Sequence, residues 1–253
     1  MTWDRLIDWL GSSLLLSLRI SPIFAFAPPF TLVRTPPLVR VMLALGLSTA
    51  MVSATAAASP PTLSLATILP IAVSELMLGA TFVLVFQVAY AAIQVAGRTV
   101  DIQAGFGLAA VLDPTTRAQM PLIGSLYVFA AGAVFFGLDG HLQLVRILAA
   151  SVEAVPLGQA VAPRSLTPLT TFVATAFMSG FGVAGGAILA LFLTDMGIAL
   201  LSRTAPQMNV LVLGFQVKTL LLMAVLPLTM GASAALLARL ASVTLEAVPA
   251  MLT

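Results

Sequence analysis

The stretch from residue 87 to residue 121 constrains the fold most, because it is too charged for a membrane span and too apolar for a loop in water. It lies between long apolar segments and carries four charged residues and three glycines, namely Arg98, Asp101, Asp113, Arg117, Gly97, Gly105 and Gly107. Each charge would cost roughly 2.5–3.5 kcal/mol at the centre of a bilayer. Irregular, glycine-containing chain is tolerated at membrane depth where protein surrounds it or where it lines a cavity. We therefore expect this stretch to form a constriction or plug that the rest of the chain holds in place.

The composition indicates an integral membrane protein. Of the 253 residues, 60% are hydrophobic and only 8% are charged, whereas a soluble domain averages roughly 25% charged residues. The apolar runs are long and continuous rather than alternating segments of about ten residues, so the sequence predicts helices and not a barrel. A secretory leader is not expected, because Asp4 and Asp8 stand where a positive leader would begin and Arg19 lies within the first apolar run.

Proline and glycine divide the apolar pattern into about six long, kinked helical segments. We expect an all-α membrane protein in which these segments form hairpins around a central re-entrant or plug loop. The predicted segments cover residues 12–33, 41–58, 65–97, 122–138, 168–201 and 210–240.

Several of these segments are not expected to be straight single crossings. Pro22 and the Pro28–Pro29 pair predict a kink and an early stop in the first, and residues 34–40 predict a tight polar turn after it. The segment 65–97 would be about 50 Å long as one helix, well beyond a hydrocarbon core of about 30 Å. It must therefore tilt, break at Pro70 or leave the membrane plane.

A pair of opposite charges lies inside the last two apolar segments. If these segments form a hairpin that turns near Pro206, Asp195 and Lys218 lie 11 and 12 residues from the turn. At about 1.5 Å per residue both are then about 17 Å from it, so we predict that they face each other. Two interpretations stay open, a structural ion pair that holds the hairpin together and a site that couples ions or protons.

Arg19 and Glu75 are the other buried charges that the pattern predicts. The same counting along the chain gives neither of them a partner. We expect contact with another subunit, or solvation at a helix end, to stabilise them, and a role in translocation is the alternative.

The sequence carries no signature of catalysis or of a metal or cofactor site. The motifs HExxH, GxSxG, GxGxxG and the P-loop are absent, as is cysteine. His141 is the single histidine, and it follows Asp139–Gly140 at a turn or helix start. One histidine without cysteine or neighbouring carboxylates is a poor metal site, and no run of basic residues supports nucleic-acid binding. We therefore expect no enzyme, no metal, no cofactor and no nucleic-acid partner.

Several local patterns occur together in an order that resembles one family. They are Arg19 with Pro22 and Pro28, Pro37-x-x-Arg40, Glu75-x-x-x-Gly79, Ala96-Gly97-x-x-x-Asp101-x-x-x-Gly105-Phe106, Asp113-Pro114 with Pro121, Gly140-His141, Ser151 with Pro156 and Gly158, and Arg203-x-x-Pro206-Gln207-Met208-Asn209-Val210 ending at Lys218. In this order and spacing the chain is similar, over nearly its whole length, to the FliR family of flagellar export-gate proteins, whose counterpart in type III secretion injectisomes is SctT. The PQMNV turn and the GF…DP block are the most specific parts.

The resemblance implies a subunit of the export gate of the flagellar type III secretion apparatus, at the flagellar basal body in the bacterial inner membrane. It implies assembly with FliP-like and FliQ-like subunits into a channel for unfolded flagellar proteins, together with FlhB-like and FlhA-like export components and membrane lipid. Family members resemble a FliP-like helical part fused to a FliQ-like hairpin, which here corresponds to residues 1–163 and 164–253.

The plug loop of the family corresponds to about Gly105–Asp113, within the charged and glycine-containing stretch. The resemblance places six plug residues there, namely Gly105, Phe106, Gly107, Leu108, Val111 and Leu112. The apolar side chains would exclude water, and the two glycines would let the loop swing aside for an unfolded substrate. The alternative is a packed re-entrant hairpin without a gating role.

Two other functions remain as alternatives. A small-solute secondary transporter would use broken helices and a buried charge pair as a site near the membrane midplane. No inverted repeat relates the two halves, however, and the chain is short for a self-contained carrier. The other alternative is an export-gate subunit of an injectisome, although the family pattern favours the flagellum.

Overall fold

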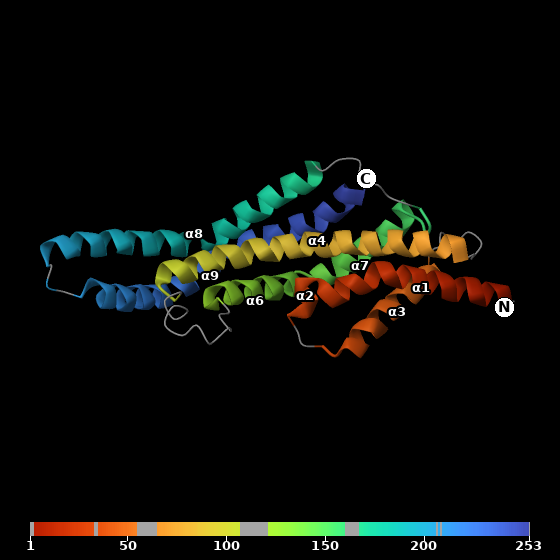
Figure 1. Ribbon diagram of the computed structural model, residues 1–253, viewed down its shortest axis with the longest axis horizontal. Helices are drawn as coiled ribbons and strands as arrows, with labels where there is room; N and C mark the ends of the chain where they lie inside the picture. The colour runs from red at the N-terminus through yellow and green to blue at the C-terminus, as the bar shows by residue number, and fades with distance from the viewer. Residues whose placement is uncertain are drawn as a thin grey trace. The chain divides into compact units, whose positions relative to one another are not determined.

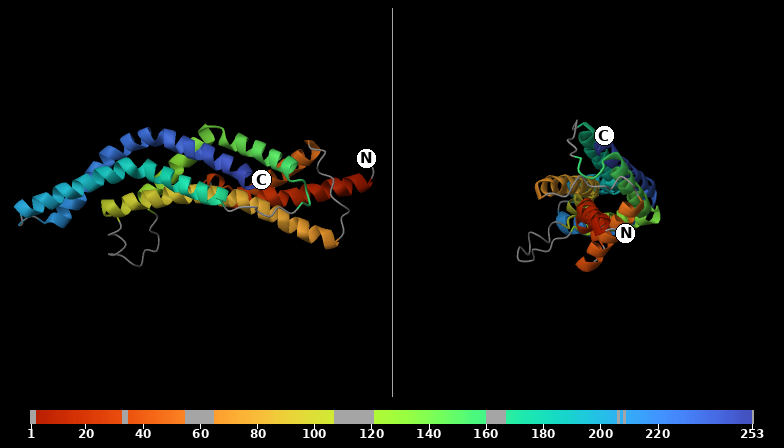
Figure 2. Two further views of the ribbon diagram at one scale, coloured as in Figure 1. Left: turned by 90° about the horizontal axis from the view of Figure 1, so that it is seen from above. Right: turned by 90° about the vertical axis from the view of Figure 1, so that its right-hand side faces the viewer.

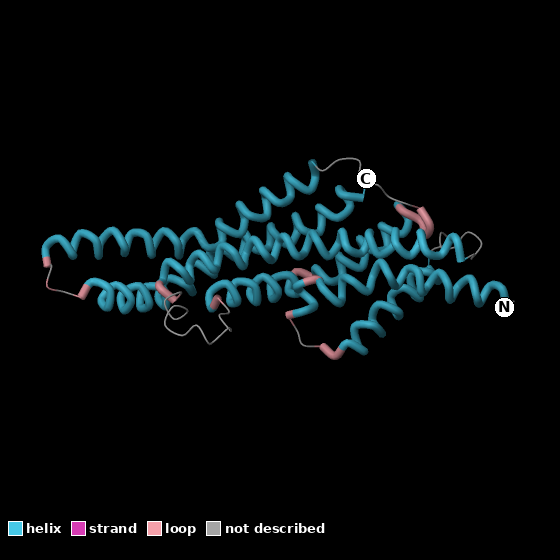
Figure 3. Tube along the Cα trace, in the orientation of Figure 1, coloured by secondary structure: helices cyan, strands magenta, loops and turns pink. Residues whose placement is uncertain are grey.

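The computed structural model describes residues 3–32, 35–54, 65–106, 121–159, 167–205, 207 and 209–252. Within these ranges every regular element is a helix, as Figures 1 and 3 show. The helices are α1 (Trp3–Phe26), α2 (Pro28–Thr31), α3 (Pro37–Ala54), α4 (Leu65–Ala104), α6 (Leu122–Gly137), α7 (Gly140–Ala154), α8 (Thr167–Thr204) and α9 (Val210–Leu252). The all-helical prediction is confirmed for the described part of the chain.

Five of the described helices are long and apolar enough to cross a membrane. The number rises to six if α6 and α7, which are bent by 69° at the break between them, count as one span. Three of the five have apolar stretches of 37, 38 and 40 residues, whereas about 20 residues cross a typical hydrocarbon core. The chain is therefore an integral membrane protein whose longest helices exceed the thickness of a bilayer.

The bend between α6 and α7 has a local cause. Asp139 adopts a left-handed backbone conformation with φ of 56°, which ends the run of helical dihedrals. Gly140 then begins α7 against the ring of Phe135, where a Cβ would lie 2.6 Å from two ring carbons. Only glycine fits this close approach, so the bend is built into the sequence.

Proline breaks the helices less often than the sequence pattern predicts. α1 contains Pro22 and ends at Phe26, so the predicted stop before Pro28 is confirmed. α4 continues through Pro70, so the break considered there does not occur. The predicted turn over residues 34–40 is shorter than expected, because α3 already begins at Pro37. Proline suits the first turn of a helix, whose amide needs no helical partner.

The chain divides into two compact units, and each is described by itself. The first contains residues 1–88, 135–173 and 242–253, and the second contains residues 89–134 and 174–241. The predicted boundary between residues 163 and 164 lies outside the described residues, so the division into FliP-like and FliQ-like parts stays a prediction.

In the first unit, side chains from other elements complete the end of α1. Gln87 Nε2 donates a hydrogen bond to Phe26 O at 2.8 Å, and Arg40 Nη1 donates one to Ala25 O at 3.3 Å. The last carbonyls of a helix have no partner within it. These bonds therefore fix the point at which α1 ends.

α1 and α4 approach closely in the same unit. A Cβ on Gly79 of α4 would lie 2.5 Å from Arg19 O and 3.0 Å from Pro22 Cγ on α1. Glycine at this position lets the two backbones come together, as small residues do at helix contacts in membrane proteins.

In the second unit, α8 and α9 form an antiparallel hairpin. Figures 1 and 2 show the two helices side by side next to their turn. Three close approaches mark the register, namely Val183 with Ser233, Gly186 with Thr229, and Ile198 with Gly214. The hairpin that the sequence predicts between the last two segments is therefore present.

Candidate functional site

The central segment leaves α4 through a tightly closed helix end. Gly105 has a φ of 92°, its amide donates to Ile102 O at 3.1 Å, and the Phe106 amide donates to Asp101 O at 3.0 Å. This pair of bonds with a left-handed glycine is the Schellman motif, which satisfies two of the carbonyls left over at a helix end. Gly105 is therefore a defined turn at the start of the segment.

A lysine from α9 bonds to the next carbonyl at this helix end. Lys218 Nζ donates to Gln103 O at 3.1 Å and also pairs with Asp195 Oδ1 of α8 at 2.5 Å. The Lys218 side chain is 18% exposed and that of Asp195 is 43% exposed. A cation is favourable here because the carbonyl end of a helix carries partial negative charge. The structure thus brings together the two residues of the predicted pair and adds a contact with α4.

The other end of the central segment is closed by Asp101. Its Oδ1 accepts the Ile123 amide at 2.9 Å and its Oδ2 accepts the Gly124 amide at 3.1 Å, and the residue is only 5% exposed. The first amides of a helix need an acceptor, which is usually a polar side chain directly before the helix. α6 begins after Pro121 and has no such residue of its own. Asp101 supplies the missing cap from α4.

A contact between two glycines brings Asp101 to this position. A Cβ on Gly97 would lie 2.5 Å from the Cα of Gly124, so α4 and α6 meet backbone to backbone one turn before Asp101. The sequence reading placed the end of the segment at Gly97, and this is wrong because α4 continues to Ala104. Gly97 serves close packing and does not end the helix.

The predicted plug residues lie only partly within the described chain. Gly105 and Phe106 are half-buried, and the Phe106 ring meets the Phe215 ring of α9 edge-on with centroids 6.4 Å apart. The remaining plug residues lie outside the described residues, namely Gly107, Leu108, Val111 and Leu112. Their role in sealing a channel stays a prediction.

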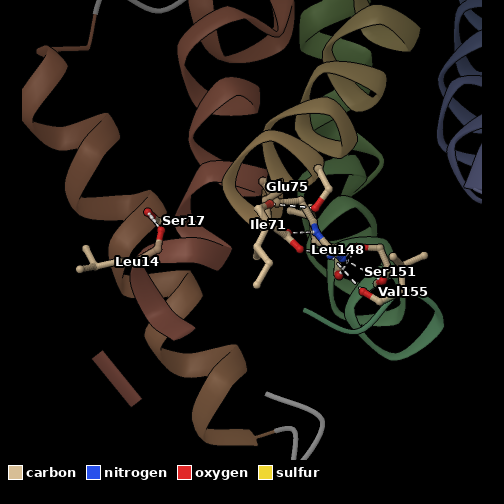
Figure 4. Close-up of polar contacts among 9 residues, drawn as sticks. Leu14, Ser17, Ile71, Glu75, Leu148, Ser151 and Val155 are labelled. Atoms are coloured by element: carbon tan, nitrogen blue, oxygen red, sulfur yellow. Dashed lines mark hydrogen bonds and ion pairs between the residues drawn. The ribbon is translucent and has the colours of Figure 1, made fainter. Parts of the chain in front are cut away.

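A second charged cluster lies in the first unit and corrects an expectation. Arg19 and Glu75 were expected to have no partner within the chain, but they pair with each other at 2.7 Å, and both side chains are fully buried. Figure 4 shows Glu75 on α4 next to Ser151 and Val155 at the end of α7. Counting along one hairpin cannot find this pair, because the two residues belong to helices separated by α2 and α3.

Arg19 uses all five of its N–H groups in this cluster. Nε and Nη2 hold the two carboxylate oxygens of Glu75 at 2.7 and 2.9 Å. Nη1 donates to Ser151 O at 2.9 Å and Ser151 Oγ at 3.3 Å, and Nη2 also donates to Val155 O at 3.0 Å. A buried charge is stable only when it is paired and fully hydrogen-bonded. The cluster therefore joins α1, α4 and the end of α7.

The remaining ionisable groups form no obvious ligand set. Within the described ranges, no three His, Asp or Glu side chains gather as they would around a metal ion. His141 lies in the first turn of α7, where its ring packs against Phe136 with centroids 5.7 Å apart.

Two functional contacts were not predicted from the sequence. Asp101 was noticed as a charge without a role, and the contact between Lys218 and Gln103 was not anticipated. A signal for the first existed, because the predicted segment that begins at residue 122 follows Met120–Pro121 and so has no polar residue directly before it to act as a cap. The second involves a backbone carbonyl, which leaves no mark on the sequence.

Together these features define an all-helical membrane protein in which charged side chains cap the helix ends on both sides of a central segment. The chain belongs to the family described as bacterial export proteins, family 1, which it matches over residues 10–243. Similar proteins include the flagellar biosynthetic protein FliR of Bacillus subtilis, 30% identical over 220 residues that cover 85% of this chain and 84% of that one. FliR of Escherichia coli is 26% identical over 216 residues, covering 85% and 82%.

A relative whose name is not flagellar also matches. The surface presentation of antigens protein SpaR of Salmonella typhimurium is 27% identical over 161 residues, which cover 64% of this chain and 60% of SpaR. Membership of the family, with relatives of both kinds, makes the chain a subunit of a type III secretion export gate.

Proposed function

We propose that the chain is the FliR-type subunit of a flagellar export gate in the bacterial inner membrane, and that residues 105–112 form its plug. The flagellar assignment is supported by FliR of Bacillus subtilis and of Escherichia coli, which each align with 85% of the chain, whereas SpaR aligns with 64%. In this role the subunit conducts unfolded proteins and seals against ions, and it performs no catalysis.

We further propose that it works in a complex with FliP-like and FliQ-like subunits, next to FlhB-like and FlhA-like components. The surface of the α8–α9 hairpin supports a partner or lipid environment, since Leu220, Met223 and Leu228 are 72%, 72% and 75% exposed. Apolar surface of this extent must be covered by lipid or by neighbouring subunits.

The observation that carries the plug proposal is the closure of both ends of the central segment. Asp101 caps the first amides of α6, and Lys218 bonds to the last turn of α4. A plug needs an apolar body that excludes water and a fixed base from which it can move. The sequence between the two caps provides the first, and the caps provide the second.

The proposal is tested by removing residues 107–112 and measuring ion leak through the assembled gate. The gate would be purified with its partners, reconstituted into liposomes and loaded with a potassium gradient. We expect assembly to persist and leak to rise, because the apolar residues that exclude water are gone. Phe106→Ala should leak less severely, and Phe129→Ala is the matched control, because Phe129 is 58% exposed on α6. An assembled deletion variant as tight as the wild type would overturn the plug.

An injectisome is the second candidate system, and a further relative supports it. The Yop proteins translocation protein T of Yersinia pestis is 28% identical over 148 residues, which cover 57% of this chain. Complementation separates the two systems. We expect the gene to restore motility to a bacterium that lacks its flagellar homologue, and restored effector secretion without motility would assign the chain to an injectisome.

A further inference from the structure

We infer that Lys218 is a positioning residue for sealing, because it caps the end of α4 and so holds the base of the central segment in its resting place. The inference rests on the proposed plug function and deepens it. In this inference α9 controls the start of the central segment, and the main role of Lys218 is the bond to α4 rather than the ion pair with Asp195.

Lys218 bonds to one of the last carbonyls of α4. The amides of Gly105 and Phe106 satisfy the carbonyls of Ile102 and Asp101. Gln103 O comes next, in the last turn of the helix, where carbonyls take partners from outside the regular helical pattern. Lys218 Nζ fills this place at 3.1 Å. A carbonyl that loses a donor away from water becomes less stable there, so removal of the ammonium weakens the hold of α9 on this end of α4.

Lys218 lies on α9 close to a second residue that contacts the start of the central segment. Phe215 lies three residues earlier, on the same face of the helix, and its ring meets that of Phe106. α9 thus contacts the chain on both sides of Gly105, at the Gln103 carbonyl before it and at the Phe106 ring after it. Gly105 has a φ of 92° and is the natural hinge between these contacts.

Asp195 orients the side chain of Lys218. It accepts from the same ammonium, so it directs Lys218 and offsets its charge. A simple ion pair keeps its function when the two residues are exchanged. The cap does not, because only a donor at position 218 can bond to Gln103 O, and a carboxylate there would repel it.

This difference gives the experiment. Four variants of the full chain would be purified with their partners and reconstituted in liposomes, namely Lys218→Gln, Lys218→Arg, Asp195→Asn and the exchange D195K/K218D. Arg203→Gln is the matched control, because it removes one positive charge from the same hairpin at an exposed position. Co-purification reports assembly, and potassium flux reports the resting leak.

We expect Lys218→Gln and the exchange to assemble and to leak. The released state of the base should become roughly 10-fold more populated, since a hydrogen bond from a charged donor is lost. Lys218→Arg and Arg203→Gln should stay tight, and Asp195→Asn should fall between. An exchange variant as tight as the wild type would show a simple ion pair and overturn the inference.

The deletion of residues 107–112 in the same assay separates this inference from the proposed function. If the deletion does not leak, the plug itself is wrong. If the deletion leaks and assembled Lys218→Gln does not, the plug stands and the role of Lys218 is wrong.

A measurement on the wild-type complex covers the case in which the variants do not assemble. Lys218 is the single lysine among the 11 basic residues of the chain, so an amine-acylating reagent followed by mass spectrometry reports one side chain. We expect slow acylation at rest and faster acylation when a stalled substrate occupies the channel. Equal rates in the two states would contradict release of the cap.

Discussion

Two ion pairs within the described residues differ in how completely they are enclosed. Arg19 and Glu75 in the first unit are fully buried, and every N–H of the arginine has an acceptor. Lys218 and Asp195 in the second unit are 18% and 43% exposed, and the lysine is shared with a backbone carbonyl. The first cluster joins three helices away from water, whereas water reaches both side chains of the second pair.

The difference in exposure predicts different consequences when one partner of each pair is removed. Removing one partner of a buried, fully hydrogen-bonded pair lowers the stability of the protein by several kcal/mol, because the remaining charge stays buried without a counter-charge or water. A partly exposed pair loses little, because water replaces the partner. We therefore expect stability to depend on the first pair and sealing to depend on the second.

The largest effect should come from Glu75→Gln. The change leaves the Arg19 charge buried without a counter-charge, and we expect a loss of about 3–5 kcal/mol of stability. Thermal melting of the purified complex and the steady-state level of the protein measure it. Glu153→Gln is the control, since Glu153 is an exposed residue near the end of α7. Equal melting of the two variants would contradict the assigned importance of the buried pair.

A smaller effect should follow from Gly79→Ala, which adds one methyl group beside the same cluster. That methyl would lie 2.5 Å from Arg19 O, and relief of such overpacking costs about 1–3 kcal/mol. Gly185→Ala is the matched control, because a Cβ there meets nothing within 4 Å. The control should melt at or slightly above the wild-type temperature, since alanine is the better helix former. A destabilised Gly185→Ala beside an unaffected Gly79→Ala would reverse this reading of the packing.

The smallest effect on stability should come from Asp195→Asn. The pair is partly exposed, so we expect a loss of less than about 1 kcal/mol. The same melting assay measures it. A loss as large as that of Glu75→Gln would remove the contrast between the two pairs.

The contrast also explains how much could be predicted from the sequence. Asp195 and Lys218 could be placed opposite each other because one turn separates their helices and a count of residues gives their depth. Arg19 and Glu75 are 56 residues apart, and their meeting depends on how α1 crosses α4. That crossing is set by Gly79, whose close packing appears only once both helices are in place.

Helix ends were predicted less well than helices. The apolar pattern located α6, α8 and the start of α9 to within a few residues, because burial in lipid depends on composition. The third segment was predicted to end at residue 97, but α4 continues to Ala104, and the contact of Gly97 with Gly124 gives this glycine a packing role. The caps at Asp101 and Lys218 act across the fold, so local sequence rules do not reveal them.

The Asp101 carboxylate holds α4 and α6 together directly, so the chain between them need not set their spacing. The Asp101 carboxylate bonds directly to the Ile123 and Gly124 amides, so the contact lies between the two helices themselves. A small epitope or fluorescent label inserted between residues 113 and 120, beyond the proposed plug residues, should therefore leave the contact between α4 and α6 in place. In the proposed gate, a label at this position would report the passage of a substrate, while Asp101 keeps α4 and α6 in register.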